Sequence, residues 1–221
     1  MLSSLALMCL IASASAQTNQ LPSLLQQAVS GTESSSASYA YDFEYSTAAQ
    51  AFSAHFSPRS QPRLRLVSPA REALNGDMRT DYDYFAEHME GVSWCAAANM
   101  SRITNARLIR EDETTATYSF QPTRESVTGE QTRRIVNHLR GEFTVTKTAP
   151  DITRIHIFAP QPFSPAPLAR VEVYVLTTTC ALAPNGRRYA SESVHQSRGS
   201  AFGRAFDTRT VRRTRNLALA G

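Results

Sequence analysis

The sequence predicts an α+β fold built on a strongly curved antiparallel sheet, a half barrel whose concave face is covered by an N-terminal helix and by inserted helices. The first observation is that the second half of the chain reads as successive segments in which residue types alternate at period two, each bounded by Gly, Pro or Asn. These segments span residues 141–149, 152–159, 168–183 and 187–199. The second observation is that stretches of helical periodicity precede and interrupt the strands, unlike in a sandwich without helices.

A short helix precedes the sheet. Apolar residues recur at the i, i+3, i+4, i+7 spacing within residues 21–29, which predicts one apolar stripe. The stripe consists of Leu21, Leu24, Leu25 and Ala28. Residues 30–37 are small and polar and predict a flexible linker. We therefore expect residues 17–38 to hold an N-terminal helix and a Ser-rich linker, and residues 39–221 to form a single curved-sheet domain.

Aromatic residues mark the first strands. Four rings alternate with other residues over residues 39–45, so all four fall on one face of a half-buried strand. Residues 50–56 repeat this alternation after a turn, which predicts a hairpin. Residues 64–67 predict a third, short strand.

A helical insertion follows the third strand. Residues 69–75 begin with proline and predict one or two helical turns. Asp77 then caps a helix over residues 77–90, and Ser93 caps a third short helix over residues 93–100.

The remaining chain alternates between strands and one more helix. Residues 106–111 and 114–121 predict two strands around a charged turn. A capping-box spacing predicts a helix over residues 128–139. The proline-rich residues 160–167 have to be extended, along an edge of the sheet. Residues 208–215 predict a last, very basic strand.

The first sixteen residues have the features of a secretory signal peptide. A short apolar core is followed by Ala14, Ser15 and Ala16, the small-x-small pattern that a signal peptidase accepts. The apolar run is shorter than the roughly 20 residues that a membrane span needs. We therefore expect cleavage after Ala16 and a periplasmic or secreted protein.

Two cysteines remain after this cleavage, Cys95 and Cys180. In an oxidising compartment they are expected to form a mutual disulfide, which would stabilise the fold by about 2–4 kcal/mol. Because one pair carries no spacing signature, two separate buried thiols are the alternative.

Arginine is concentrated at the C-terminal end. Eight arginines lie from Arg187 onward, against Glu192 and Asp207. Such an end predicts contact with an anionic partner such as a membrane surface. Few aromatic residues are interleaved for base stacking, so nucleic acid is not an expected partner. The alternative is that these arginines form the solvated faces of exposed strands.

No stretch carries a catalytic signature. Cys95, near the start of a predicted helix and seven residues after His88, would suit a thiol hydrolase. A disulfide would remove that nucleophile. The five histidines lack metal-ligand spacing, and no glycine-rich loop cradles a phosphate. We therefore predict a protein that is not an enzyme and that has no catalytic residue, no metal and no cofactor.

Many aromatic residues share one face of the predicted sheet. If the helices over residues 77–90 and 128–139 lie on the concave side, they form a plug or lid over an apolar cavity. The alternative is an ordinary packed core, where regularly spaced aromatic residues are usually found. The predicted cavity-lining residues are Tyr39, Tyr41, Phe43, Tyr45, Phe52, Phe56, Met78, Tyr82, Phe85, Met89, Trp94, Tyr118, Phe120, Phe143, Tyr174 and Leu176.

This order of segments resembles the periplasmic lipoprotein-carrier fold, the LolA/LolB-like half barrel. The shared pattern is a signal peptide, a leading helix, the aromatic strands over residues 39–56, the helical insertion over residues 69–100 and the returning strands over residues 143–182. The resemblance implies that the protein binds an acyl chain or another lipid-like ligand beneath helical lids and carries it to a membrane or an acceptor. A non-enzymatic structural or adaptor protein of the cell envelope is the alternative function.

Overall fold

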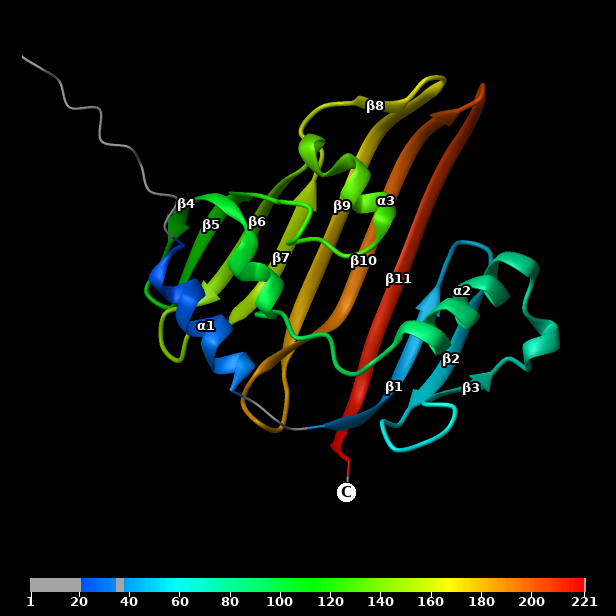
Figure 1. The fold of residues 1–221 in the computed structure, drawn as a ribbon, viewed down its shortest axis with the longest axis horizontal. Helices are drawn as coiled ribbons and strands as arrows, with labels where there is room; N and C mark the ends of the chain where they lie inside the picture. Colours follow the sequence, from blue (N-terminus) through cyan, green and yellow to red (C-terminus); the bar gives the residue numbers. More distant parts are fainter. Residues whose placement is uncertain (1–20, 35–37, 221) are drawn as a thin grey trace, which may run out of the picture.

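The computed structural model describes residues 21–34 and 38–220, which form an α+β fold with one open, curved antiparallel sheet of eleven strands and three α-helices (Figure 1). The predicted signal peptide, residues 1–16, lies outside the described residues. The helices are α1 (Ser23–Glu33), α2 (Gly76–His88) and α3 (Glu130–Ile135). The strands are β1 (Tyr39–Ser46), β2 (Ala51–Phe56), β3 (Leu64–Ser68), β4 (Thr104–Glu111), β5 (Thr115–Gln121), β6 (Arg140–Thr146), β7 (Ile152–Phe158), β8 (Phe163–Ala166), β9 (Ala169–Leu182), β10 (Arg188–Ala201) and β11 (Arg204–Leu219).

The first strand of the sheet pairs with the last strand. Its strand order is β3-β2-β1-β11-β10-β9-β7-β6-β5-β4, and β8 pairs with β9 at one end. Because β1 lies antiparallel to β11, the three N-terminal strands extend the sheet that the second half of the chain builds. The three longest strands, β9, β10 and β11, extend beyond their neighbours at the top of Figure 1.

The alternating aromatic residues form the half-buried strand that the sequence predicts. All four rings of β1 are buried, and the residues between them are partly exposed. In the β1–β2 ladder Tyr41 lies opposite Phe56 and Tyr45 opposite Phe52. Cross-strand partners share a face of the sheet, so the rings of the two strands form one apolar surface. Helix α2 covers this surface, with Phe85 in the same core cluster.

The other end of the sheet is covered by α1. Leu25 and Ala28 of this helix belong to a second core cluster with Phe143 and Val145 of β6. The 3₁₀ helix η2 (Ala98–Arg102) packs beside α1 and contributes to the same cluster. The two ends of the sheet therefore have separate cores under separate helices.

Two helix boundaries differ from the sequence predictions for local reasons. Helix α1 continues to Glu33, into the predicted linker, because Thr32 is buried and its hydroxyl is a hydrogen-bond partner of a side chain outside the helix. Helix α2 begins at Gly76 because Asn75 is its N-cap, whose side chain accepts a hydrogen bond from the backbone N–H of Met78 at 2.8 Å. Before it, only the 3₁₀ turn η1 (Arg71–Ala73) forms.

The helix predicted over residues 93–100 is wrong. Trp94 forms an isolated antiparallel bridge with Tyr189, and the backbone N–H of Cys95 donates to the carbonyl oxygen of Arg188 at 3.0 Å. This pairing holds Trp94 against β10, a turn follows at Cys95 and Ala96, and only the end of the segment is helical, in η2. A short window of moderate helix propensity does not resist such tertiary pairing.

The helix predicted over residues 128–139 is shorter than expected. It divides into α3 and the 3₁₀ turn η3 (Val136–His138), and its N-cap is Gly129, which has no side chain with which to form the predicted capping box. The proline-rich segment does run along an edge, where its later part is β8 on β9.

Gly141 allows a close approach between β5 and β6. A β-carbon on Gly141 would lie 2.2 Å from the ring carbon Cζ of Phe120, its cross-strand partner. Phe120 is only 4 % exposed, so its ring cannot move aside without disturbing the core.

We predict that Gly141→Ala lowers the free energy of unfolding by about 1–3 kcal/mol, as expected for overpacking, in urea titrations followed by circular dichroism. Gly91→Ala is the matched control because a β-carbon there meets nothing within 4 Å, and its effect should stay within about 0.5 kcal/mol. Equal effects of the two substitutions would contradict this packing.

Candidate functional site

A row of cross-strand partners crosses the helix-covered face of the sheet from β1 to β4. In order, it contains Tyr45, Arg212, Ser193, Thr178, Ile155, Phe143, Tyr118 and Leu108. The two ends of the row are apolar or aromatic, whereas its centre on β11, β10 and β9 is polar. Two residues further along, Thr210 and His195 form the next pair of β11 and β10 on the same face. We name the residues Arg212, Thr210, Ser193, His195 and Thr178 the central polar strip.

The central polar strip lies beside the ring cluster, the aromatic residues of β1, β2 and α2 that include Tyr45, Phe52 and Phe85. Arg212 is exposed, and the other members are partly exposed. The hydroxyl oxygens of Thr178 and Ser193 lie 3.0 Å apart and share a hydrogen bond. The guanidinium carbon of Arg212 is 4.8 Å from the centroid of the Phe85 ring, so a cation stands against the edge of α2.

His195 is an uncharged member of this strip at neutral pH. Burial, and the nearby charge of Arg212, lower the pKa of its imidazole. Its ring lies 4.9 Å from that of Tyr174, and its Nε2 atom is buried without a hydrogen-bond partner among the described residues. The strip therefore offers one fixed positive charge together with neutral hydrogen-bonding groups.

The ring cluster at the β1 end is well packed. Burial raises the pKa of Tyr45 to about 12, and Asp81 of α2 adds to this rise through charge and a hydrogen bond. The rings of Tyr41 and Phe56 are stacked with their centroids 4.8 Å apart, and the ring centroids of Phe85 and Phe43 lie 5.0 Å apart. These rings contact one another and α2, so a cavity at this position requires α2 to move.

The residues predicted to line one cavity are divided among several groups. The group under α2 contains Tyr41, Phe43, Tyr45, Phe52, Phe56, Met78, Tyr82 and Phe85, with Met89 packed beside it. The group at the β5–β6 end contains Phe120 and Phe143, with Tyr118 packed beside it. Tyr174 belongs to a third cluster, Leu176 is partly buried, and the ring centroids of Tyr39 and Trp94 lie 6.0 Å apart. The residues predicted to line one cavity thus belong to several packed clusters.

Two hollows of the described surface are lined by other residues. A hollow of about 240 Å³ lies on the opposite face of β4–β7, and a hollow of about 390 Å³ lies at the turn between β8 and β9. The first is lined by Arg110, Thr117, Glu142, Thr144, Arg154 and His156. Sequence periodicity does not reveal it, because these residues read as an ordinary polar strand face.

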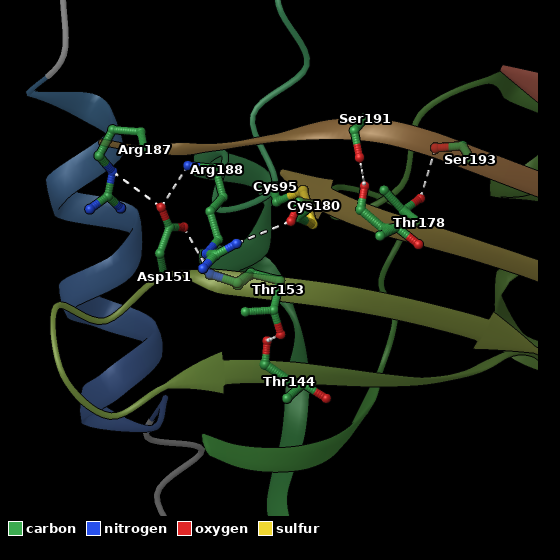
Figure 2. The surroundings of a disulfide bond; sticks show 12 residues. Cys95, Thr144, Asp151, Thr153, Thr178, Cys180, Arg187, Arg188, Ser191 and Ser193 are labelled. Carbon is green, nitrogen blue, oxygen red and sulfur yellow. Dashed lines mark hydrogen bonds and ion pairs between the residues drawn. A yellow bond between two sulfur atoms is a disulfide. The ribbon is translucent and has the colours of Figure 1, made fainter. Parts of the chain in front are cut away.

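The disulfide between Cys95 and Cys180 is present, with an S–S distance of 2.05 Å (Figure 2). It ties the segment before η2 to β9 and indicates an oxidising compartment. A bonded Cys95 has no thiolate to act as a nucleophile. Among the described residues, no helix is long and apolar enough to cross a membrane.

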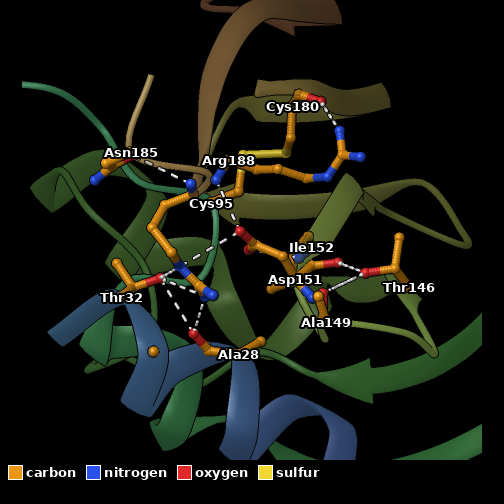
Figure 3. Close-up of polar contacts among 12 residues, drawn as sticks. Ala28, Thr32, Cys95, Thr146, Ala149, Asp151, Ile152, Cys180, Asn185 and Arg188 are labelled. Carbon is orange, nitrogen blue, oxygen red and sulfur yellow. Dashed lines mark hydrogen bonds and ion pairs between the residues drawn. A yellow bond between two sulfur atoms is a disulfide. The ribbon is translucent and has the colours of Figure 1, made fainter. Parts of the chain in front are cut away.

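A buried carboxylate next to the disulfide fastens α1 to the sheet (Figure 3). Asp151 Oδ2 accepts the backbone N–H of Arg188 at 2.7 Å and lies 3.6 Å from Nε of Arg187. The guanidinium of Arg187 in turn donates to the carbonyl oxygen of Ala28 and, at 3.0 Å, to the hydroxyl of Thr32. Burial raises the pKa of Asp151, although the N–H bonds and both arginines act against this rise. We name Asp151, Arg187 and Thr32 the α1 latch.

The sequence gives no sign of the α1 latch. Asp151 reads there as a turn residue before a strand, and Arg187 as one of many arginines. Only the fold brings the helix, the β6–β7 turn and the β9–β10 turn together.

We predict that Asp151→Ala lowers the free energy of unfolding by about 3–5 kcal/mol, because the charge of Arg187 would be left without its carboxylate partner. The Arg187 side chain is only 18 % exposed, so water cannot fully replace that partner. The backbone N–H of Arg188 would also lose its acceptor. Urea titration measures the effect. Glu87→Ala removes a carboxylate whose side chain is 78 % exposed and serves as the control, with a change within about 0.5 kcal/mol. A similar small change for Asp151→Ala would contradict the latch.

Comparisons with protein-family models, with curated proteins and with solved structures find no match. What the protein does is therefore inferred from the geometry of its described residues.

Proposed function

We propose that this protein is an exported carrier or binding protein for a lipid-like ligand, and that α2 is a lid over the ring-bearing part of the sheet. In this proposal residues 1–16 are a signal peptide and the protein acts in the periplasm or outside the cell. The sheet is then a half barrel whose concave face the helices cover, as in the lipoprotein-carrier fold that the sequence resembles. The proposal is carried by one observation: among the described residues, the short helix α2, rather than a second sheet, covers a continuous aromatic surface on β1 and β2.

The way α2 is attached supports a lid. The ring centroid of Phe85 lies 5.0 Å from that of Phe43 and 5.2 Å from that of Tyr45. A hydrogen bond from the Tyr82 hydroxyl to the carbonyl oxygen of Leu64 is long, at 3.3 Å. Apolar contacts are not directional, so an acyl chain can replace ring contacts without leaving many buried polar groups unpaired. Helix α2 also has directional contacts to the sheet through Asp81 and Tyr82, whereas the bonds of the α1 latch are centred on a buried carboxylate and fix α1 more firmly.

The central polar strip suits the head group of such a ligand. Arg212 stands against Phe85, where an acyl chain lying under α2 would emerge. Its guanidinium can bind a carboxylate or a phosphate through two parallel hydrogen bonds. The hydroxyls of Thr178 and Ser193 lie beside it on the same face. We therefore propose an acyl chain with an anionic head group as the ligand class.

Arg212 is distinct from the arginines next to it in sequence. The alternation of β11 places Arg213 and Arg215 on the opposite face of the sheet. There Arg213 pairs with Glu192 at 2.7 Å and Arg215 lies 3.7 Å from Glu44. Arg215 therefore provides a matched control for substitution of Arg212.

Titration with the fluorescent fatty acid cis-parinaric acid tests the proposal. We expect saturable binding by the purified protein, weakened about tenfold by Arg212→Ala because a charge-assisted hydrogen bond is lost. Arg215→Ala should bind like the unmodified protein. Lack of saturable binding would contradict the carrier function, and equal weakening by both substitutions would contradict the role given to Arg212.

A structural or adaptor role in the cell envelope is the second candidate. It is favoured by Arg209, Arg213 and Arg215, which share the opposite face of β11 and could meet an anionic partner or membrane surface. The acidic partners of Arg213 and Arg215 reduce the charge available for this purpose. Salt-sensitive envelope association that Arg209→Glu abolishes, in a protein that binds no fatty acid, would favour this role over the first.

A further inference from the structure

Two β-turns at one end of the longest strands each expose a large apolar side chain. Leu168, between β8 and β9, is 75 % exposed, and Phe202, between β10 and β11, is 79 % exposed. The backbone N–H of Phe202 donates to the carbonyl oxygen of Leu168 at 2.9 Å, so the turns are held side by side. Both lie at the top of Figure 1, far from the C-terminus and from α2. We name this pair of turns the paired tips.

The backbone at the paired tips does not favour these residues. Leu168 has φ 62° and Phe202 has φ 51°, both in the left-handed region. Glycine and asparagine are preferred in such turns, since a bulky side chain is strained there. Folding in water alone would therefore select small or polar residues at two exposed turn positions. Two adjacent turns that instead keep large apolar side chains indicate contact with an apolar environment.

The surroundings of the paired tips combine apolar and basic character. Residues 165–169 are all Pro, Ala or Leu. Within residues 165–171 and 199–206 the charged residues are Arg170 and Arg204, without any Asp or Glu. An apolar projection flanked by arginines matches the interface of a membrane, where tails lie beneath anionic head groups.

We infer that the paired tips dock on an anionic membrane surface, with Leu168 and Phe202 inserted at the boundary between head groups and tails. Arg170 and Arg204 then lie at the level of the head groups. The hollow of about 390 Å³ beside Leu168 is lined by Arg170 and by Ser164 and Ser200, whose side chains can donate to a phosphate. Docking of this kind depends on the proposed exported location, but it needs no ligand under α2.

Vesicle flotation tests the inference, with vesicles of phosphatidylglycerol and phosphatidylcholine in equal amounts. The full chain should float with these vesicles and bind less well to phosphatidylcholine alone. The double variant Leu168→Asn, Phe202→Asn should lose binding by roughly tenfold or more, because two apolar side chains are removed from the interface. Its midpoint of thermal unfolding should be equal or higher, since asparagine tolerates a positive φ.

Leu182→Asn is the matched control. It replaces a side chain that is 61 % exposed at the other end of β9, and vesicle binding should be retained. Vesicle binding by the double variant that equals that of the unmodified protein would overturn the inference, as would an unmodified protein that binds no vesicle. Equal binding to vesicles without phosphatidylglycerol would overturn the role of Arg170 and Arg204. Because cis-parinaric acid is titrated without vesicles, failure of docking and failure of the proposed carrier function give different results.

Discussion

The packing of Phe85 against the rings of β1 and β2 is the interaction on which the rest of this structure depends. Residues 21–34 and 38–220 form one open sheet, and within them it is helix α2 that buries the aromatic surface. Because α2 is held mainly by ring contacts, another apolar group can replace those contacts, and few buried polar groups would lose a hydrogen bond. The contact that completes the core at this end is therefore the one that the proposed ligand would replace.

The two ends of the sheet are stabilised by different kinds of interaction. At the α1 end, a disulfide and the α1 latch add covalent and directional bonds to the apolar core. At the α2 end, rings pack on rings. The central polar strip separates these two cores. If α2 opens as proposed, α1, η2 and the strands beneath them keep their own bonds and are expected to stay in place.

Local patterns predicted much of the fold but little of the site. The period-two alternation of rings in β1 and the breaks around β9 are local signals, and the α+β class with an antiparallel sheet followed from them. The helix over residues 93–100 failed because bonds to β10 were not visible in a short window. Arg212 looked like one of many arginines until its register opposite Tyr45 placed it apart from Arg213 and Arg215. Long-range register cannot be read from composition, so the central polar strip and the α1 latch both required coordinates.

Hydrogen exchange followed by mass spectrometry tests most directly whether α2 is a lid. If it is, amides of residues 76–88 exchange through a local opening whose free energy is well below that of global unfolding, while those of β1, β2 and α1 remain protected. The measurement should be made on the protein without ligand, at a series of denaturant concentrations below the unfolding transition. Exchange of α2 only together with β1 and β2, in a single global unfolding, would contradict the account.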